Sequence, residues 1–159
     1  MEEILKHLKD LNISYDIENH VPVYTIEEME NLNSDKLKNA CICKNLFLRD
    51  QKGKKHFLYV LSEDKRANLS ELSEKLQSGK LSFASEERLQ KYLNVEKGAV
   101  TPLAILFDKV GAVQICLDKD CIKNPVLGVH PGVNTSTVLI SNDDLIKYIE
   151  STGHSIMYL

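Results

Sequence analysis

The chain has 159 residues, of which 43% are hydrophobic and 27% are charged, and its formal net charge is −3. This length suits one compact domain, and the composition excludes a disordered chain. No apolar run approaches the ~20 residues of a membrane span, and the acidic start of the chain lacks a signal-peptide pattern. We therefore expect a cytoplasmic protein without a membrane partner.

The first half of the sequence predicts two helices, a strand and a β-hairpin. Apolar residues at helical spacing open the chain, and alternation of apolar and polar residues follows. A capping box, Thr25-Ile26-Glu27-Glu28, marks the start of the second helix. Two apolar runs flank a turn around Gly53, as in a hairpin. The expected elements are a helix at 1–11, a strand at 13–17, an extended segment at 20–24, a helix from 25 to about 32, and strands at 41–48 and 56–61.

The second half predicts three more helices and further strands. Asn68, Ser85 and Ser141 each precede a helical pattern, as N-cap residues do. The continuous apolar run 103–107 predicts a central strand, with 113–117 as its neighbour across a turn at Gly111. The expected elements are helices at 68–79, 85–93 and 141–153, the first and last ended by glycine, a short apolar segment at 81–84, and strands at 103–107, 113–117, 126–130, 137–140 and 155–159.

These elements do not follow a regular βαβ rhythm, and the hairpins favour a mixed sheet. We predict an α+β fold, in which residues 1–159 form one domain with a mixed β-sheet and surrounding helices.

Four cysteines are present, at positions 41, 43, 116 and 121. Without an export signal we do not expect disulfides. The spacings differ from those of common structural zinc sites, whose pairs lie about two to four residues apart. Cys41 and Cys43 would share one strand face with apolar residues. We therefore expect buried, reduced thiols rather than a metal site.

Basic residues gather in one stretch despite the negative net charge. A local cationic surface of this kind can hold several phosphates. The alternative is a lysine-rich hairpin turn whose charge only maintains solubility. The residues are Lys36, Lys38, Lys44, Arg49, Lys52, Lys54, Lys55 and His56, followed by Lys65 and Arg66.

Standard catalytic motifs are missing from the sequence. There is no Gly-x-Ser-x-Gly nucleophile elbow, no His-Glu-x-x-His metal helix, no P-loop and no Gly-x-Gly-x-x-Gly fingerprint. An enzyme with this sequence is expected to work without a serine triad, a bound metal or a nucleotide cofactor.

Three segments nevertheless carry unusual residues. Lys44 and Asn45 stand within an apolar strand pattern. A lysine in this position either extends its ammonium to the surface at the end of the sheet, or loses hydration and requires a compensating interaction. The loop Gly98-Ala99-Val100-Thr101-Pro102 either presents backbone groups to a ligand or is an ordinary connection. Between two apolar strands, residues 128–137 combine glycines, a proline, His130 and polar side chains. That density suits a hydrogen-bonding rim.

These three segments, together with others in the same chain order, resemble the motifs of the YbaK/prolyl-tRNA editing domain family. The resemblance is greatest to its free-standing alanyl-tRNA(Pro) deacylases. The resemblance covers nearly the whole chain. Each piece is weak alone, and the ordered series is specific. It rests on His20-Val21-Pro22-Val23-Tyr24-Thr25-Ile26-Glu27-Glu28, Lys44-Asn45-Leu46-Phe47-Leu48-Arg49-Asp50, Leu61-Ser62-Glu63-Asp64-Lys65-Arg66, Leu81-Ser82-Phe83-Ala84-Ser85-Glu86-Glu87-Arg88-Leu89, Gly98 to Pro102, and His130-Pro131 with Asn134 to Thr137.

The resemblance implies hydrolysis of the ester between an amino acid and the 3′-terminal adenosine of tRNA. A synthetase pocket built for proline rejects the smaller alanine poorly, since one methylene is worth about 1–3 kcal/mol, and a second pocket too small for proline corrects the error. The implied partners are the acceptor end of tRNA(Pro) carrying a small amino acid, and prolyl-tRNA synthetase. We expect a monomer that needs no cofactor. The alternatives are removal of cysteine or serine, or a non-catalytic regulator that binds tRNA or the synthetase.

The resemblance also implies the site. The family's key lysine corresponds to Lys44, which would hold a phosphate of the terminal adenosine or polarise the ester carbonyl. The ribose 2′-hydroxyl helps to orient the attacking water in this family. Gly132, where a bulkier residue is usual, leaves the amino-acid preference open. We expect catalytic roles for Lys44, Gly98, Pro102 and His130, substrate contacts from Val21, Pro22, Tyr24, Asn45, Ala99, Val100, Thr101, Gly128, Asn134 and Ser136, tRNA contacts from Arg49, Lys52, Lys54 and Lys55, and no metal ligand.

Overall fold

The computed structural model describes residues 1–22 and 35–159. The helix expected from Thr25 to about Leu32 lies outside the described residues. The helices are α1 (Glu2–Asp10), α3 (Asp35–Lys38), α4 (Leu69–Leu76), α5 (Glu86–Leu93), the 3₁₀ helix η1 (Pro102–Phe107), α6 (Lys119–Ile122) and α7 (Asn142–Ser151). The strands are β1 (Asp16–Asn19), β2 (Cys41–Arg49), β3 (His56–Ser62), β4 (Ser82–Phe83), β5 (Val113–Leu117), β6 (Val126–Val129), β7 (Ser136–Ser141) and β8 (Ile156–Tyr158).

In this part of the chain the strands form one mixed sheet with the order β1-β7-β6-β2-β3-β5-β8, and β4 pairs with β2. β2 and β3 make the expected antiparallel hairpin. β2 also pairs in parallel with β6, and β5 lies parallel to β3 and β8. The predicted α+β fold with a mixed sheet and surrounding helices is confirmed.

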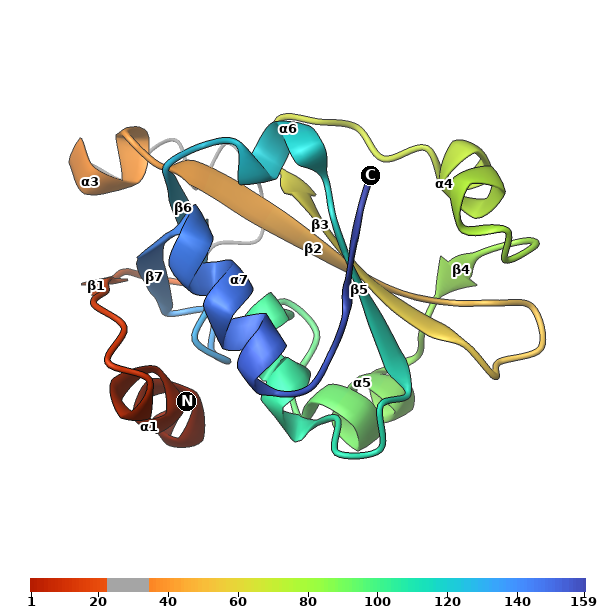
Figure 1. Ribbon diagram of the computed structural model, residues 1–159, viewed down its shortest axis with the longest axis horizontal. Coiled ribbons are helices and arrows are strands. Elements are labelled where there is room, and N and C mark those ends of the chain that lie inside the picture. Colours follow the sequence, from red (N-terminus) through yellow and green to blue (C-terminus); the bar gives the residue numbers. More distant parts are fainter. Residues whose placement is uncertain (23–34) are drawn as a thin grey trace.

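The helices cover the two faces of the sheet unequally. Residues of α1, α5, α7 and η1 share the larger apolar core with inward-facing residues of β2, β3 and β5. A smaller core on the other face joins β2 and β3 to α4. Figure 1 shows α1, α5 and α7 grouped on one side and α4 standing apart from them. None of the described helices combines the length and the apolar character needed to cross a bilayer.

Helix starts follow the sequence because they depend on local bonds. The side chains of Asn68, Ser85 and Ser141 each accept a hydrogen bond from a backbone N–H in the first turn of the following helix, as expected of N-caps. The end of α4 differs from the prediction. The helix is closed by Gln77 in a left-handed conformation (φ +53°), two residues before Gly79, which has φ +72°.

Residues 103–107 do not form the central strand that their continuous apolar run predicts. They belong to η1, which begins where the Thr101 hydroxyl accepts the N–H of Leu103 and where Pro102 has no N–H to give to a sheet. The predicted strand 113–117 exists as β5, but its neighbours are β3 and β8. A buried strand and a buried 3₁₀ helix both have apolar side chains on every side, so the apolar run could not distinguish between them.

Tyr148 of α7 anchors η1 from within the core. Its hydroxyl donates a hydrogen bond of 2.7 Å to the carbonyl oxygen of Leu103, and both residues are fully buried. An unpaired buried carbonyl is costly, so this bond helps to fix the helix that follows the loop 98–102.

We expect Tyr148→Phe to lower the free energy of unfolding by about 1–3 kcal/mol, because the Leu103 carbonyl loses its partner. Urea denaturation followed by circular dichroism measures the change. Tyr158→Phe is the matched control, since Tyr158 is 42% exposed and its replacement should change the free energy by less than about 0.5 kcal/mol. Equal effects of the two substitutions would show that η1 does not depend on this bond.

Candidate active site

The candidate site begins where β2 parts from β6. The parallel ladder between them joins Cys41 to Leu127 and Ile42 to Gly128, and then stops. β2 continues, paired with β3 as far as Arg49, and β4 takes the place of β6 at Leu48 and Arg49. Lys44 lies two residues beyond the last pair of this ladder, and His130 directly follows the end of β6. Both residues therefore lie close to the point where the two strands separate.

Gly128 lies in the last residue pair of this ladder, and its missing side chain leaves room for Ile42. A Cβ atom on Gly128 would lie 2.5 Å from Cδ1 of Ile42 and 3.2 Å from Cγ2 of Thr137. A side chain here would therefore first displace the end of the Ile42 side chain. Gly128 was expected to touch substrate, and that role stays a prediction.

Lys44 is half-buried, and its ammonium makes no hydrogen bond or ion pair with any residue that the structure describes. Alternation along β2 puts it on the face of Leu46 and Leu48, which pack against the smaller core. A partly desolvated cation without a partner is poorly compensated, so this position favours binding of an anion or a polarised oxygen.

Asn45 points to the opposite face of β2. Its Nδ2 donates a hydrogen bond of 3.1 Å to the carbonyl oxygen of Val100, which ties the strand to the loop 98–102. Its Oδ1 is buried and has no partner among the described residues. The structure thus ties Asn45 to the loop through Val100, and the substrate contacts expected of both residues stay predictions.

The loop from Gly98 to Pro102 is held at both ends. Gly98 is exposed and has φ +93°, a left-handed conformation that side chains disfavour. Ala99, Thr101 and Pro102 are buried, and Thr101 caps η1. Only Gly98 and part of Val100 are therefore accessible to a ligand in this loop.

His130 is held in one tautomer. Its Nδ1 lies 3.1 Å from the carbonyl oxygen of Ser136, which can only accept, so Nδ1 carries the proton. Nε2 is left as an acceptor. Burial lowers the pKa of His130 below the ordinary histidine value, against the raising effect of the Ser136 carbonyl, and the nearby His20 lowers it further. The imidazole is therefore neutral near pH 7.

The structure adds contacts that were not predicted for this region. Nε2 of His20 lies 2.8 Å from the Thr137 hydroxyl, and the Ser136 hydroxyl donates to the side chain of Asn19 at 2.7 Å. These bonds join β1 to β7 beside His130. His20 stood next to Pro22 in the sequence, but nothing there indicated Thr137 as its partner.

The remaining predicted residues are more dispersed. Val21 and Pro22 are exposed, and Tyr24 lies outside the described residues. Asn134 is half-buried in the loop between β6 and β7. No hydrogen bond or ion pair in the described part of the chain joins these residues to Lys44, and their expected role in setting pocket size stays a prediction.

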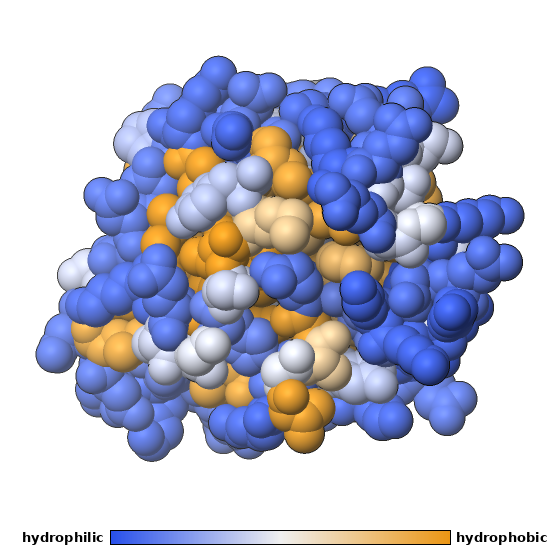
Figure 2. Space-filling view, turned by 45° about the vertical axis from the view of Figure 1, so that its right-hand side comes forward, coloured by the Kyte–Doolittle hydropathy of each residue, from blue (hydrophilic) through white to orange (hydrophobic). Residues whose placement is uncertain are grey.

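The predicted tRNA contacts sit at the far end of the β2–β3 hairpin. Lys52, Lys54 and Lys55 are exposed, and Arg88 fixes the turn by donating to the carbonyl oxygen of Gly53 at 3.1 Å. Figure 2, turned so that the right-hand side of Figure 1 comes forward, shows a surface that is largely hydrophilic, with apolar residues exposed mainly in its middle. From Lys44 to Arg49 the strand covers ~17 Å, so the basic tip is well separated from the lysine.

Comparison with known proteins assigns the family. The sequence profile of the Aminoacyl-tRNA editing domain matches residues 20–148, which include β2, the loop 98–102 and His130. The chain belongs to this family. The resemblance inferred from the sequence is thereby confirmed, and so is the prediction of an aminoacyl-tRNA deacylase.

Individual relatives agree. The prolyl-tRNA editing protein ProX of Acetoanaerobium sticklandii is 43% identical over 154 residues, covering 97% of this chain and 93% of that protein. The prolyl-tRNA synthetase associated domain-containing protein 1 of Danio rerio is 34% identical over 160 residues, with coverages of 99% and 85%. The solved structure of a candidate trans-editing enzyme for prolyl tRNA synthetase superposes with a TM-score of 0.73 at 17% identity, covering 99% of this chain and 94% of that one, and shares the fold.

We expect His130 to be half-protonated below pH ~6.5 and to show the Nδ1–H tautomer at pH 7, because burial disfavours the charged ring and Ser136 accepts from Nδ1. Because the pKa of His130 is lower in the folded state, protonation of this ring favours unfolding. Its contribution to the free energy of unfolding is therefore fully present above pH ~6.5 and decreases as the pH falls through the folded-state pKa. Imidazole ¹H–¹⁵N correlation spectra across a pH titration test this, with His130→Gln to assign the signals. A protonated Nε2 at pH 7 would contradict the assignment.

Proposed function

We propose that this protein is a free-standing editing domain that acts in trans on mischarged tRNA(Pro), with alanine as the preferred amino acid. It would hydrolyse the ester at the 3′-terminal adenosine and release the amino acid and free tRNA. The observation that carries the proposal is the Lys44 ammonium, which makes no hydrogen bond or ion pair with the described residues and follows the point where β6 leaves β2. The printed names of the relatives, a prolyl-tRNA editing protein and prolyl-tRNA synthetase associated proteins, support the choice of tRNA.

Lys44 supplies positive charge where the substrate carries negative charge. Because the Lys44 side chain is half-buried, its interaction with an oxygen is screened less than it would be in bulk water. Bound to a phosphate of the terminal adenosine, it would position the ester. Bound to the ester carbonyl, it would stabilise the oxyanion that develops during attack. Both roles require the same free ammonium.

Acceptors near the opening can orient the nucleophile. Nε2 of His130 and Oδ1 of Asn45 are both acceptors without a partner in the described structure. Nε2 of His130 can receive a hydrogen bond from a water molecule or from the ribose 2′-hydroxyl, whereas the buried Oδ1 of Asn45 lies on the face of β2 opposite to Lys44. In the loop 98–102, the backbone at the exposed Gly98 can bind the amino group or the ester. An aminoacyl ester is already activated, so positioning of water and charge can supply much of the rate.

Selectivity rests on size. The proline ring exceeds an alanine side chain by more than one methylene, and a rigid pocket excludes the larger group sterically while it admits the smaller. Loop 98–102 suits this purpose because Asn45 holds one side and the buried Thr101 and Pro102 hold the other.

Lys44→Ala should lower kcat/KM for Ala-tRNA(Pro) by more than about 100-fold, since charge stabilisation of this kind is worth about 10²–10³ in rate. Release of labelled alanine under single-turnover conditions measures it. Lys109→Ala is the matched control, because Lys109 is an exposed lysine in the turn before β5. Lys44→Arg separates the two roles. Arginine keeps the positive charge and should restore activity if Lys44 binds a phosphate, but less so if Lys44 must align with the ester carbonyl.

The substrate panel comprises Ala-, Cys-, Ser- and Pro-tRNA(Pro). We expect alanine to be released fastest and proline to be spared. Faster release of cysteine or serine would replace the substrate assignment while leaving the enzyme class intact. Equal, near-uncatalysed release by wild type and Lys44→Ala would refute hydrolysis and leave a tRNA-binding regulator.

We also propose that the hairpin tip contacts the acceptor stem. Its exposed lysines stand at a fixed distance from Lys44, because both lie on the continuous strand β2 and the turn that follows. Phosphate contacts release counterions, which makes binding depend on salt.

Replacing Lys52, Lys54 and Lys55 together with alanine should weaken tRNA binding at low salt and reduce the slope of log K against log salt by about 0.9 for each phosphate that is no longer neutralised. Fluorescence anisotropy over a salt series measures both. A triple variant at the exposed Lys9, Lys80 and Lys109 keeps the same net charge and serves as control. If both triples change the slope equally, binding depends on overall charge and not on the tip.

A further inference from the structure

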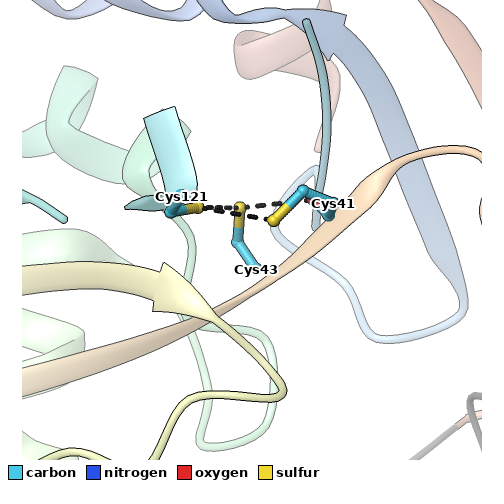
Figure 3. Close-up of side chains that lie close together, drawn as sticks. All are labelled: Cys41, Cys43 and Cys121. Carbon is cyan, nitrogen blue, oxygen red and sulfur yellow. Dashed lines mark hydrogen bonds between the residues drawn. The ribbon is translucent and has the colours of Figure 1, made fainter. Parts of the chain in front are cut away.

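Three of the four cysteines meet at one point. Cys41 and Cys43 project from β2 and Cys121 projects from α6, with their sulfurs directed toward one another (Figure 3). Sγ of Cys121 lies 3.4 Å from Sγ of Cys43 and 3.7 Å from Sγ of Cys41. All three sulfurs lie within 4.8 Å of one another, and no other group of this kind occurs in the part of the chain that the structure describes.

The sulfur spacing matches that of thiolates around one metal ion. With Zn–S bonds of ~2.3 Å in a tetrahedron, ligand sulfurs stand ~3.8 Å apart. In a disulfide they are ~2.05 Å apart. The distances of 3.4 and 3.7 Å therefore need only small adjustments for three sulfurs to hold an ion, and a much larger one to form a bond.

The cluster is closed on the core side and open on the other. Cys43 and Cys121 are buried, whereas Cys41 is half-buried and lines a hollow of about 520 Å³. Ser62 and Lys38 line the same hollow. An ion could thus enter from solvent, take three ligands from the protein and keep one position toward the hollow for water.

Cys116 shows what an ordinary core cysteine looks like in the same molecule. It is fully buried in β5 among the apolar residues of the smaller core, and burial alone raises the pKa of its thiol to about 12. It has no sulfur partner in the described structure. Burial in the core therefore does not by itself gather thiols, and the convergence of the other three is a separate feature.

We propose that Cys41, Cys43 and Cys121 form a binding site for one thiophilic divalent ion of the Zn²⁺ type. On binding, the three thiols release three protons to solvent, three S–Zn bonds form, and the complex carries one net negative charge. The site joins the beginning of β2 to α6 and so braces the strand that carries Lys44. It is independent of the proposed hydrolysis.

The test uses the reduced, full-length protein and Co²⁺ as a spectroscopic probe, followed by displacement with Zn²⁺. We expect one equivalent of Co²⁺ per chain, with intense thiolate-to-cobalt charge-transfer bands that Zn²⁺ abolishes. Zn²⁺ should also raise the melting temperature. Changes around a metal site that leave the ligands intact already cost 10–100-fold in affinity, so Cys121→Ala should weaken binding by more than about 100-fold.

Two further variants keep the result interpretable if Cys121→Ala fails to fold. Cys41→Ser alters the half-exposed member and should lose the charge-transfer bands while retaining the wild-type circular dichroism spectrum. Cys116→Ala is the matched control and should bind Co²⁺ like wild type. The proposal is overturned if wild type binds no Co²⁺ with all thiols reduced, if Cys41→Ser binds as tightly as wild type, or if thiol titration shows that the cluster has closed to a disulfide.

Discussion

The short parallel ladder between β2 and β6 is the constraint on which the rest of the structure depends. Two residue pairs hold the strands together, and the missing side chain of Gly128 leaves room for that of Ile42. Beyond that point this edge of β2 has no strand partner until β4 pairs with Leu48 and Arg49. A buried backbone edge must find partners, and a polar opening in the middle of a sheet is where a substrate can supply them.

Elements that depend on local chemistry were predictable. The caps at Ser85 and Ser141 bond to backbone groups three residues away, so the sequence contains both partners. The hairpin around Gly53 and the mixed sheet followed from similar patterns. The prediction of a strand at 103–107 was wrong because an apolar run does not distinguish a strand from a helix when every side of the segment is buried. In addition, the residue that holds this segment, Tyr148, is distant in the sequence.

In the candidate site, too, features that depend on local sequence could be predicted, and contacts between distant residues could not. Lys44 and Asn45 stood out because polar groups in an apolar strand are costly, and the contact of Asn45 with Val100 agrees with that reading. The partners of His20 and the union of Cys121 with Cys41 could not be predicted, since each joins residues that only the sheet order brings together. The spacing of the cysteines along the sequence argued against a metal site. The third sulfur comes from α6, which only the fold brings next to β2.

β2 carries sulfurs near its beginning, a lysine and an amide with opposite orientations in its middle, and the basic turn at its end. Because side chains alternate along a strand, one inserted or deleted residue would exchange the two faces over everything that follows. Lys44 would then enter the larger core and Asn45 would leave the loop. The turn at 50–55 has no such restriction. Among homologous chains, changes in length should therefore accumulate in this turn and be absent from the strand.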